Sequence, residues 1–471
     1  MNAPITTDIC VIGAGSGGLS VAAGAVQMGA EVVLIEKDKM GGDCLNTGCV
    51  PSKALLAAGK HAQAFRTSGP FGIKPATPNI DFAAAMAHVR EVIQGIEPHD
   101  SVERFESLGV NVIKGAARFT SRNEVAVGER RIRAKRFVIA TGSRATVPPI
   151  PGIDDTDYLT NETLFENSAC PDHLIIVGGG PIGIEMAQAH YRLGVKVTVL
   201  ERMRALPNDD PDLAAIVVKA LLDEGVSIRE EVNIASVSGK TGDVRVTLQD
   251  GEEIRGSHLL MATGRAPGVA DLGLDEAGIQ YSRSGVEVDS RLRTTNKRVF
   301  AIGDAKGGLM FTHLAGYDAG IVIRNILFKL PTKANYSAIP WVTYTDPELS
   351  QVGLTEAQAK EQYGDAIKVV QWEYAENDRA RAERITSGLI KVVAGKRGKI
   401  LGAGIAGTGA GEIIQPWQIA VAKGYKMADM AGIISPYPTL SEISKRAAGS
   451  YFADRLFSPR TRKIVRLLLK L

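Results

Sequence analysis

Short apolar runs, each followed by a glycine-rich turn, mark two segments that lie far apart in this chain. In residues 8–37 (DICVIGAGSGGLSVAAGAVQMGAEVVLIEK), an apolar run ends at glycines, a helical stretch follows, and a second apolar run ends at Glu36. Residues 173–202 (HLIIVGGGPIGIEMAQAHYRLGVKVTVLER) repeat this order. The pattern predicts strand, turn, helix and strand twice, and therefore an α/β fold.

The glycines of both turns have the spacing G-x-G-x-x-G, and an acidic residue follows 18 residues after the last glycine. Such glycines allow a tight turn and let the backbone approach a pyrophosphate at a helix N-terminus, while the carboxylate binds a ribose hydroxyl. Each segment therefore predicts a Rossmann-like domain that binds one dinucleotide. The residues of the first site are Gly13, Gly15, Gly18 and Glu36, and those of the second are Gly178, Gly180, Gly183 and Glu201.

The acidic residue of the second site bears on which nicotinamide nucleotide binds there. Glu201 favours the free 2′-hydroxyl of NADH, because its carboxylate would repel the 2′-phosphate of NADPH. Arg202 and Arg204 lie close enough in the sequence to bind such a phosphate. We therefore expect NADH, with NADPH as the less favoured alternative.

Two of the four cysteines lie five positions apart in the segment GGDCLNTGCVPSK. The segment must curl if Cys44 and Cys49 are to come within disulfide distance, and Gly42 and Gly48 permit such a curl. Pro51 favours the start of a helix here, which places Cys49 near the positive end of a helix dipole and stabilises its thiolate. We interpret Cys44 and Cys49 as a redox-active pair.

A structural disulfide or half of a zinc site is the alternative for this pair. Zinc normally takes four ligands, and the remaining cysteines, Cys10 and Cys170, do not form a second pair, so we expect no resident metal. Structural disulfides are rare in cytosolic proteins, and several features indicate the cytoplasm. The first eight residues carry no Lys or Arg, and beyond residue 35 no long uncharged run predicts a membrane-spanning helix. A net charge of +3 is too small to indicate nucleic-acid binding.

Further motifs extend the pattern along the whole chain. Ala-Thr-Gly ends apolar runs at 140–142 and 262–264, Asp304 lies in AIGDA, and residues 339–356 read IPWVTYTDPELSQVGLTE. Together with the cysteine segment and both glycine turns, these motifs resemble class I flavoprotein disulfide reductases, which include dihydrolipoamide dehydrogenase, glutathione reductase and mercuric reductase. The resemblance implies two Rossmann-like dinucleotide-binding domains and an α+β C-terminal dimerisation domain. The expected domains are a discontinuous FAD-binding domain (1–150 and 265–335), an NAD(P)-binding domain (151–264) and a dimerisation domain (336–471).

The same resemblance implies a reaction in which electrons pass from NAD(P)H through FAD and the Cys44–Cys49 disulfide to a small disulfide. Cys49 would face the flavin and Cys44 would exchange with the acceptor, in a homodimer whose active site is shared between the two chains. Lys53 would pair with Glu185 beside the flavin, although each could also be a solvated helix charge. The other cofactor residues carried over are Thr141, Gly142, Asp304, Thr312 and His313 for FAD, and Gly264 for NAD.

The chain departs from this family where lipoamide and glutathione reductases have a catalytic histidine. Tyr437 occupies that position, Glu442 follows five residues later, and no histidine follows His313. A phenol with a pKa of about 10 is a poor base at neutral pH, and a positioned general base is worth roughly 10²–10⁴ in rate.

Two alternatives follow from Tyr437. Mercuric reductases are similar in having Tyr at this position, so a metal ion is the alternative acceptor, although no cysteine follows Cys170 to form the C-terminal pair of those enzymes. Tyr437 could instead be a surface aromatic whose ring is packed against the domain.

The last segment, residues 455–471 (RLFSPRTRKIVRLLLKL), has six basic residues and no acidic one. Its apolar residues recur at helical spacing, so a basic amphipathic helix is predicted. We expect this helix to pack on its own subunit, as amphipathic helices commonly do. Peripheral contact with an anionic membrane is the alternative, and with it a third function, that of a membrane-associated flavoprotein that binds a partner.

Overall fold

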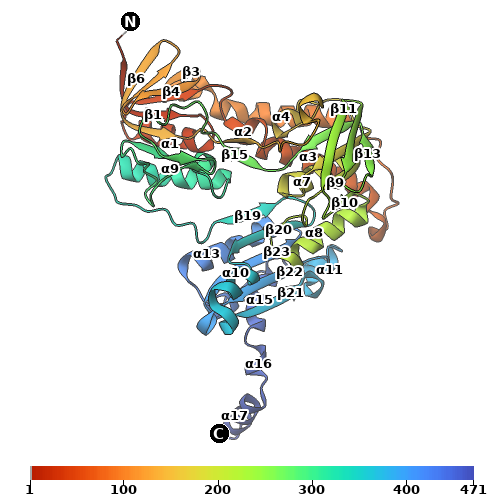
Figure 1. Ribbon diagram of the computed structural model, residues 1–471. Helices are drawn as coiled ribbons and strands as arrows, with labels where there is room; N and C mark the ends of the chain where they lie inside the picture. Colours follow the sequence, from red (N-terminus) through yellow and green to blue (C-terminus); the bar gives the residue numbers. More distant parts are fainter. Residues whose placement is uncertain (1–2) are drawn as a thin grey trace.

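The N-terminal part of the chain forms a sheet, and the first glycine turn follows the first strand of this sheet (Figure 1). In the computed structural model, which describes residues 3–471, β1 (Ile5–Ile12) lies between β2 (Val32–Glu36) and β6 (Arg130–Ile139), and all three run parallel. Every residue of β2 is buried, as expected for a parallel strand covered on both faces. Three shorter strands extend the sheet: β3 (Asn111–Lys114), β5 (Glu124–Val127) and β4 (Ala117–Ser121).

The chain returns to this sheet after passing through a second folded unit. β18 (Val299–Ala301) pairs in parallel with β6. α9 (Thr312–Ile326) lies against α1 (Ser16–Gln27), the helix that follows the first glycine turn (Figure 1). A discontinuous first domain requires this topology. Its boundaries at 1–150 and 265–335 stay predictions.

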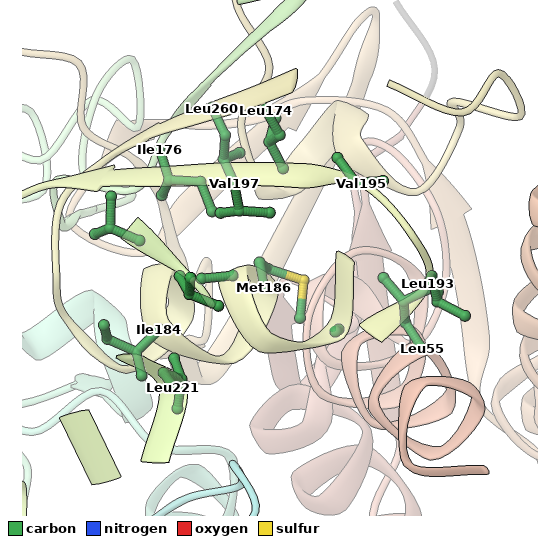
Figure 2. Packing of buried hydrophobic residues seen from close by; sticks show 14 of the residues in the cluster. Leu55, Leu174, Ile176, Ile184, Met186, Leu193, Val195, Val197, Leu221 and Leu260 are labelled. Carbon is green, nitrogen blue, oxygen red and sulfur yellow. The ribbon is translucent and has the colours of Figure 1, made fainter. Parts of the chain in front are cut away.

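The second glycine turn follows a strand of a separate parallel sheet. α7 (Pro181–Arg192) connects the paired strands β8 (His173–Val177) and β9 (Lys196–Leu200), and β14 (His258–Met261) pairs with β8 on the other side. Apolar side chains of the sheet and of α7 form the core of this unit, and Leu55 of α3 (Cys49–Arg66) joins them (Figure 2). The helix that follows the cysteines is therefore anchored in the second unit. The labelled side chains of the sheet and of α7 are Leu174, Ile176, Val197, Leu260, Ile184 and Met186.

The C-terminal part is built on an antiparallel sheet. In spatial order its strands are β19 (Pro340–Thr343), β20 (Glu348–Gly353), β23 (Ile400–Gly407), β22 (Leu389–Ala394) and β21 (Lys368–Glu373). α13 (Gln415–Lys423) and α15 (Glu442–Ser450) pack on it, and Trp417 between them is fully buried, with its Nε1 donating to Ser444 Oγ at 3.0 Å. Two α/β units, each with a parallel core of strands around a glycine turn and its helix, and one α+β unit confirm the predicted fold class.

The tail forms two short helices that project away from the rest of the molecule (Figure 1). α16 (Ala453–Leu456) and α17 (Pro459–Leu468) contain no buried residue, and Leu468 is 58% exposed. The expected helix is present, but the expectation that it packs on its own subunit is wrong for the single chain, because residues 3–471 do not bury its apolar side chains. Among residues 3–471, no helix is both long and apolar enough to cross a membrane.

Candidate active site at the cysteine pair

The cysteine segment folds into one short helix followed by a long one. α2 (Gly42–Asn46) carries Cys44, and α3 begins at Cys49. Gly42 has a φ of 59°, which residues with a side chain rarely adopt. A Cβ at Gly42 would also lie 2.8 Å from the Cα of Gly15. The segment therefore curls as predicted, and it lies directly against the first glycine turn.

The two thiols differ in their readiness to ionise. Cys44 and Cys49 are free and close enough to share a hydrogen bond, and Cys49 Sγ lies 3.3 Å from Thr312 Oγ1 at the start of α9. The hydrogen bond from Cys44 lowers the pKa of Cys49 to about 6, and Thr312 and the charge of Lys53 act in the same direction. The pKa of Cys44 is raised, because it donates to Cys49 and is partly buried. At neutral pH the pair holds one thiolate, on Cys49.

Lys53 and Glu185 form an ion pair next to the cysteines. Lys53 lies one helical turn after Cys49, and its Nζ is 2.9 Å from Glu185 Oε2 on α7. The other carboxylate oxygen of Glu185 accepts a hydrogen bond from the backbone N of Tyr344 at 2.9 Å. Glu185 is only 4% exposed, so it is not a solvated helix charge, and its burial requires a partner. The expected pairing is present, while its role beside a flavin stays a prediction.

The first glycine turn has the shape that a dinucleotide needs. A Cβ at Gly18 would lie 1.8 Å from the carbonyl oxygen of Gly13, whereas a Cβ at Gly15 would meet nothing closer than 3.9 Å. The helix can therefore approach the strand closely, and space remains at the N-terminus of α1, where a pyrophosphate binds. Glu36 stands beside this turn and accepts hydrogen bonds from two backbone amides, at 2.6 and 2.7 Å. These residues fit FAD.

The second glycine turn repeats this geometry. A Cβ at Gly183 would lie 2.0 Å from the carbonyl oxygen of Gly178, while a Cβ at Gly180 would meet no atom within 4 Å. Glu201 accepts hydrogen bonds from the backbone amides of Gly179 and Met203, at 2.6 and 2.8 Å. The turn therefore fits a second dinucleotide, with a carboxylate at the same place as in the first.

The two arginines near Glu201 differ in availability. Arg204 donates hydrogen bonds to the backbone carbonyls of Pro207 and Asp209, at 2.9 and 2.7 Å. Arg202 is exposed. Arg202 is therefore the more available of the two for a 2′-phosphate, because Arg204 is held by hydrogen bonds from its Nη2.

Asp304 lies just after β18 and is linked to the cysteine segment by residues that the sequence analysis missed. It accepts a hydrogen bond of 2.5 Å from Ser143 Oγ, and burial raises its pKa. Ser143 Oγ in turn accepts from Arg265 Nε at 2.8 Å, and Arg265 Nη2 lies 3.2 Å from Asp43 Oδ1. Ser143 and Arg265 directly follow the two Ala-Thr-Gly motifs, which was the available signal.

The remaining cofactor residues predicted from the resemblance lie at turns and at a helix start. Gly142 and Gly264 have positive φ angles of 66° and 128°, and Thr141 Oγ1 donates to a backbone carbonyl at 2.7 Å. His313 Nε2 lies 2.8 Å from the carbonyl oxygen of Pro340, and burial lowers the pKa of this imidazole. Their roles toward FAD and NAD stay predictions.

Tyr437 and Glu442 are engaged with other residues of their own domain. The Tyr437 hydroxyl donates to Asp378 Oδ2 at 3.1 Å, which raises the pKa of the phenol, and Glu442 pairs with Arg446 at 2.9 Å. Tyr437 is 69% exposed, so within the single chain its ring is not packed against its own domain. Within the described chain neither residue hydrogen-bonds to the cysteine pair. Their expected approach to Cys44 therefore needs a second subunit.

Comparison with known proteins places these motifs in one family. The family described as pyridine nucleotide-disulphide oxidoreductase matches residues 7–319, and its dimerisation domain matches residues 339–448. Mercuric reductase of Bacillus cereus is 35% identical over 453 residues, which cover 95% of this chain and 72% of that protein. Dihydrolipoyl dehydrogenase of Staphylococcus aureus is 35% identical over 457 residues, which cover 94% of this chain and 96% of that protein.

The similarity extends to solved structures. The Cu(II) complex of the HOCl-induced flavoprotein disulfide reductase RclA from Escherichia coli has a TM-score of 0.86 and 30% sequence identity, and the match covers 96% of this chain and 100% of that one. LpdA from Mycobacterium tuberculosis has a TM-score of 0.86 and 26% identity, over 94% and 99% of the two chains. The chain therefore belongs to the pyridine nucleotide-disulphide oxidoreductase family, flavoprotein enzymes that use FAD and NAD(P)H.

Proposed function

We propose that this protein is a homodimeric reductase that takes electrons from NADH and delivers them through Cys44 and Cys49 to a small disulfide. The observation that carries the proposal is the Cys49 thiolate, which begins α3 in the segment that lies against the first glycine turn. The first glycine turn, Glu36 and Asp304 would hold FAD. The chemistry that FAD supplies when bound is two-electron transfer between a nicotinamide and a dithiol.

The two sulfurs have separate tasks in disulfide exchange. Cys44 loses its proton and attacks one sulfur of the acceptor, so that a mixed disulfide forms and one acceptor thiolate leaves. The Cys49 thiolate then attacks the Cys44 sulfur, which restores the Cys44–Cys49 disulfide and releases the second acceptor thiolate. Two electrons have passed to the acceptor. The proton from Cys44 neutralises the first thiolate released, and water protonates the second.

The acceptor site is proposed to lie between two subunits, with Tyr437 and Glu442 of the second subunit near Cys44. The match to a dimerisation domain supports this arrangement, and the large exposure of Tyr437 leaves its ring available to a second subunit. A phenol that donates to a carboxylate is a weak base, because deprotonation would place two negative charges side by side. Small disulfides are therefore expected to react more slowly than in enzymes with histidine there.

A metal ion is the second candidate acceptor. Tyr437 supports it, as do the names of two relatives, a mercuric reductase and a disulfide reductase solved as a Cu(II) complex. Such an acceptor does not need a proton from an imidazole. The two candidates separate in an acceptor screen.

NADH is the proposed electron donor, and the cytoplasm, where NADH is supplied, is the proposed location. Glu201 lies at the second glycine turn, where it can accept from a ribose hydroxyl. Arg204 is already bonded to two carbonyls. A 2′-phosphate would therefore meet the exposed Arg202 beside a repelling carboxylate, while Arg204 is held in place by its bonds to the two carbonyls.

The screen uses FAD-loaded enzyme, NADH and four acceptors: lipoamide, glutathione disulfide, Hg(II) and Cu(II). We expect NADH oxidation with a disulfide, and loss of that turnover in Cys44→Ser while NADH still bleaches the flavin absorbance. Cys170→Ser, outside the site, is the matched control and should behave as wild type. Turnover that is faster with a metal ion than with every disulfide would favour the second candidate. Full turnover in Cys44→Ser would remove the dithiol from the mechanism.

The exposed tail carries a further part of the proposal, which is contact with an anionic membrane surface. Ser458 caps α17 by accepting a hydrogen bond from the backbone N of Thr461 at 3.2 Å. At 3.6 residues per turn, Ile464 and Leu468 lie on one face of the helix and Arg466 on the opposite face. All six charges of the tail are positive, whereas the rest of the chain has more acidic than basic residues. Attraction to anionic lipid is therefore local to this helix.

Vesicle co-sedimentation tests this contact on the intact dimer. Binding is expected to phosphatidylglycerol-containing vesicles and not to phosphatidylcholine alone, and to be lost on deleting residues 456–471 or in Leu468→Asp. Leu222→Asp, an exposed leucine of the second unit, is the control and should bind as wild type does. Binding that survives the deletion would refute the assignment. A deletion that instead dissociates the dimer would identify a second copy as the partner of the tail.

A further inference from the structure

Asp43, the residue just before Cys44, is held by three side chains, one from the cysteine segment itself and two from distant parts of the chain. Its Oδ1 accepts hydrogen bonds from Thr47 Oγ1 at 2.9 Å and from Asn161 Nδ2 at 2.8 Å. Arg265 Nη2 lies 3.2 Å from the same oxygen. An acidic side chain beside the redox pair is thus fixed in place, and one cation is paired with it.

Arg265 reaches Asp43 from the point where the chain leaves the second dinucleotide unit. It begins β15 (Arg265–Pro267), and its side chain is 14% exposed. Its Nε donates to Ser143 Oγ, whose hydroxyl donates to Asp304. The guanidinium therefore bridges two acidic groups, one at the cysteine segment and one at the proposed FAD site. A guanidinium, whose N–H donors point in several fixed directions, can bond to Asp43 and Ser143 at once, whereas a lysine ammonium is a single point charge.

The charge of Asp43 acts on the thiolate. The hydrogen bond from Cys44 lowers the pKa of Cys49 most, and Thr312 and the charge of Lys53 lower it further. Burial and the charge of Asp43 raise this pKa. A cation paired with Asp43 offsets part of its field at the sulfur. The titratable or charged groups around Cys49 are Cys44 and Asp43 on α2, Lys53 on α3, Glu185 on α7 and Tyr344 after β19.

We propose that Arg265 is a positioning residue whose ion pair with Asp43, 3.2 Å between Nη2 and Oδ1, offsets a negative charge beside the cysteine pair and so favours the Cys49 thiolate. The inference deepens the proposed function and rests on its assignment of the dithiol. It concerns the ionisation of one sulfur, so it is tested without any acceptor.

The experiment titrates the long-wavelength absorbance that a Cys49 thiolate gives beside bound flavin, in two-electron-reduced holoenzyme, between about pH 4.5 and 9. Mapping of iodoacetamide-modified peptides gives a second readout, the rate at which Cys49 is alkylated. Arg265→Gln should move the midpoint upward by about one pH unit, because Asp43 is unmasked. Asp43→Asn should move it downward, because Arg265 is then unopposed. The double variant should return close to wild type.

Two controls separate charge from general disturbance. Arg265→Lys keeps the charge and should stay nearer to wild type than Arg265→Gln does. Lys135→Gln removes an exposed ion pair with Asp8, 2.6 Å long and outside the site, and should not move the midpoint. A purely structural role would shift Arg265→Gln and Asp43→Asn in the same direction.

Equal directions for the two single variants, or no shift in either, would overturn the proposal. If Arg265→Gln does not fold, Asp43→Asn and the double variant decide together, because they differ only in Arg265. A midpoint that is lower in Asp43→Asn and returns close to wild type in the double variant supports the proposal, and equal midpoints in the two refute it. Absence of the long-wavelength band in wild type would count against the proposed function instead. The alkylation rates would then still test the effect of Arg265 on Cys49.

Discussion

Cys44 and Cys49 are the same chemical group five residues apart, and their surroundings give them different chemistry. Cys49 begins α3 and receives hydrogen bonds from Cys44 and Thr312, so its thiolate is stabilised. Cys44 lies on α2 and donates to Cys49, which makes its own ionisation harder. This difference supports the proposed separate roles of the two cysteines, because disulfide exchange needs both a stable thiolate and an exchanging thiol.

The pKa of about 6 for Cys49 predicts how turnover depends on pH. Because this pKa is lowered, the thiolate is present above about pH 6 and is lost as the pH falls through that value. NADH-dependent reduction of a disulfide should therefore fall about tenfold per unit at lower pH. The measurement is kcat/KM from about pH 4.5 to 8, with Lys53→Met expected to move the inflection upward. An inflection near 8.5, the ordinary value for a thiol, would contradict the prediction.

A buried cluster of ion pairs joins a strand of the C-terminal unit to a helix of the second unit. Lys391 on β22 is 4% exposed, and its Nζ lies 3.1, 2.7 and 2.6 Å from carboxylate oxygens of Asp210, Asp212 and Glu356. Asp210 also caps α8 (Pro211–Glu224) of the second unit. The cluster therefore fixes the second unit, which carries α8, against the C-terminal sheet.

Lys391→Met is expected to lower the free energy of unfolding by about 3–5 kcal/mol, because the buried Asp210 loses its cation. Asp212→Asn should cost less than about 1 kcal/mol, because Asp212 is largely exposed. Chemical denaturation followed by circular dichroism compares the two variants. Similar losses in both would show that burial of Asp210 does not depend on Lys391.

Whether the proposed acceptor of electrons meets a general base beside Cys44 depends on the assembly of two subunits. Tyr437 belongs to the dimerisation domain, and its hydroxyl is bonded to Asp378 within its own chain. Any action of Tyr437 on Cys44 has to come from a second subunit. The dimer is thus the unit that would complete the proposed site.

Tyr437→His is expected to raise turnover with lipoamide by about 10²-fold, because an imidazole titrates near neutral pH and a phenol does not. The assay is NADH oxidation by the dimer, whose size is verified by light scattering. Tyr425→His, an exposed tyrosine elsewhere in the domain, is the matched control and should leave the rate unchanged. An unchanged rate in Tyr437→His would show that the missing base does not limit the reaction.

Features of the site that depend on residues close together in the sequence could be predicted from the sequence alone. The glycine turns could be predicted, because a Cβ at Gly18 or Gly183 would overlap a carbonyl oxygen and only glycine fits there. The start of a helix at Cys49 could also be predicted, because the spacing of the glycines and Pro51 favours it. Ser143, Arg265 and Asp43 were not singled out, because their importance lies in contacts between segments more than 100 residues apart.

By itself, the sequence determined the two dinucleotide units, the redox pair and the helical tail, because each follows from short-range sterics and the alternation of apolar and polar residues. Only the tertiary structure decided that Glu185 is buried against Lys53, that Arg204 is already bonded to carbonyls, and that the tail is left exposed by the described part of its own chain. The physical reason is that ion pairs and burial depend on which elements meet, and local patterns do not specify those meetings.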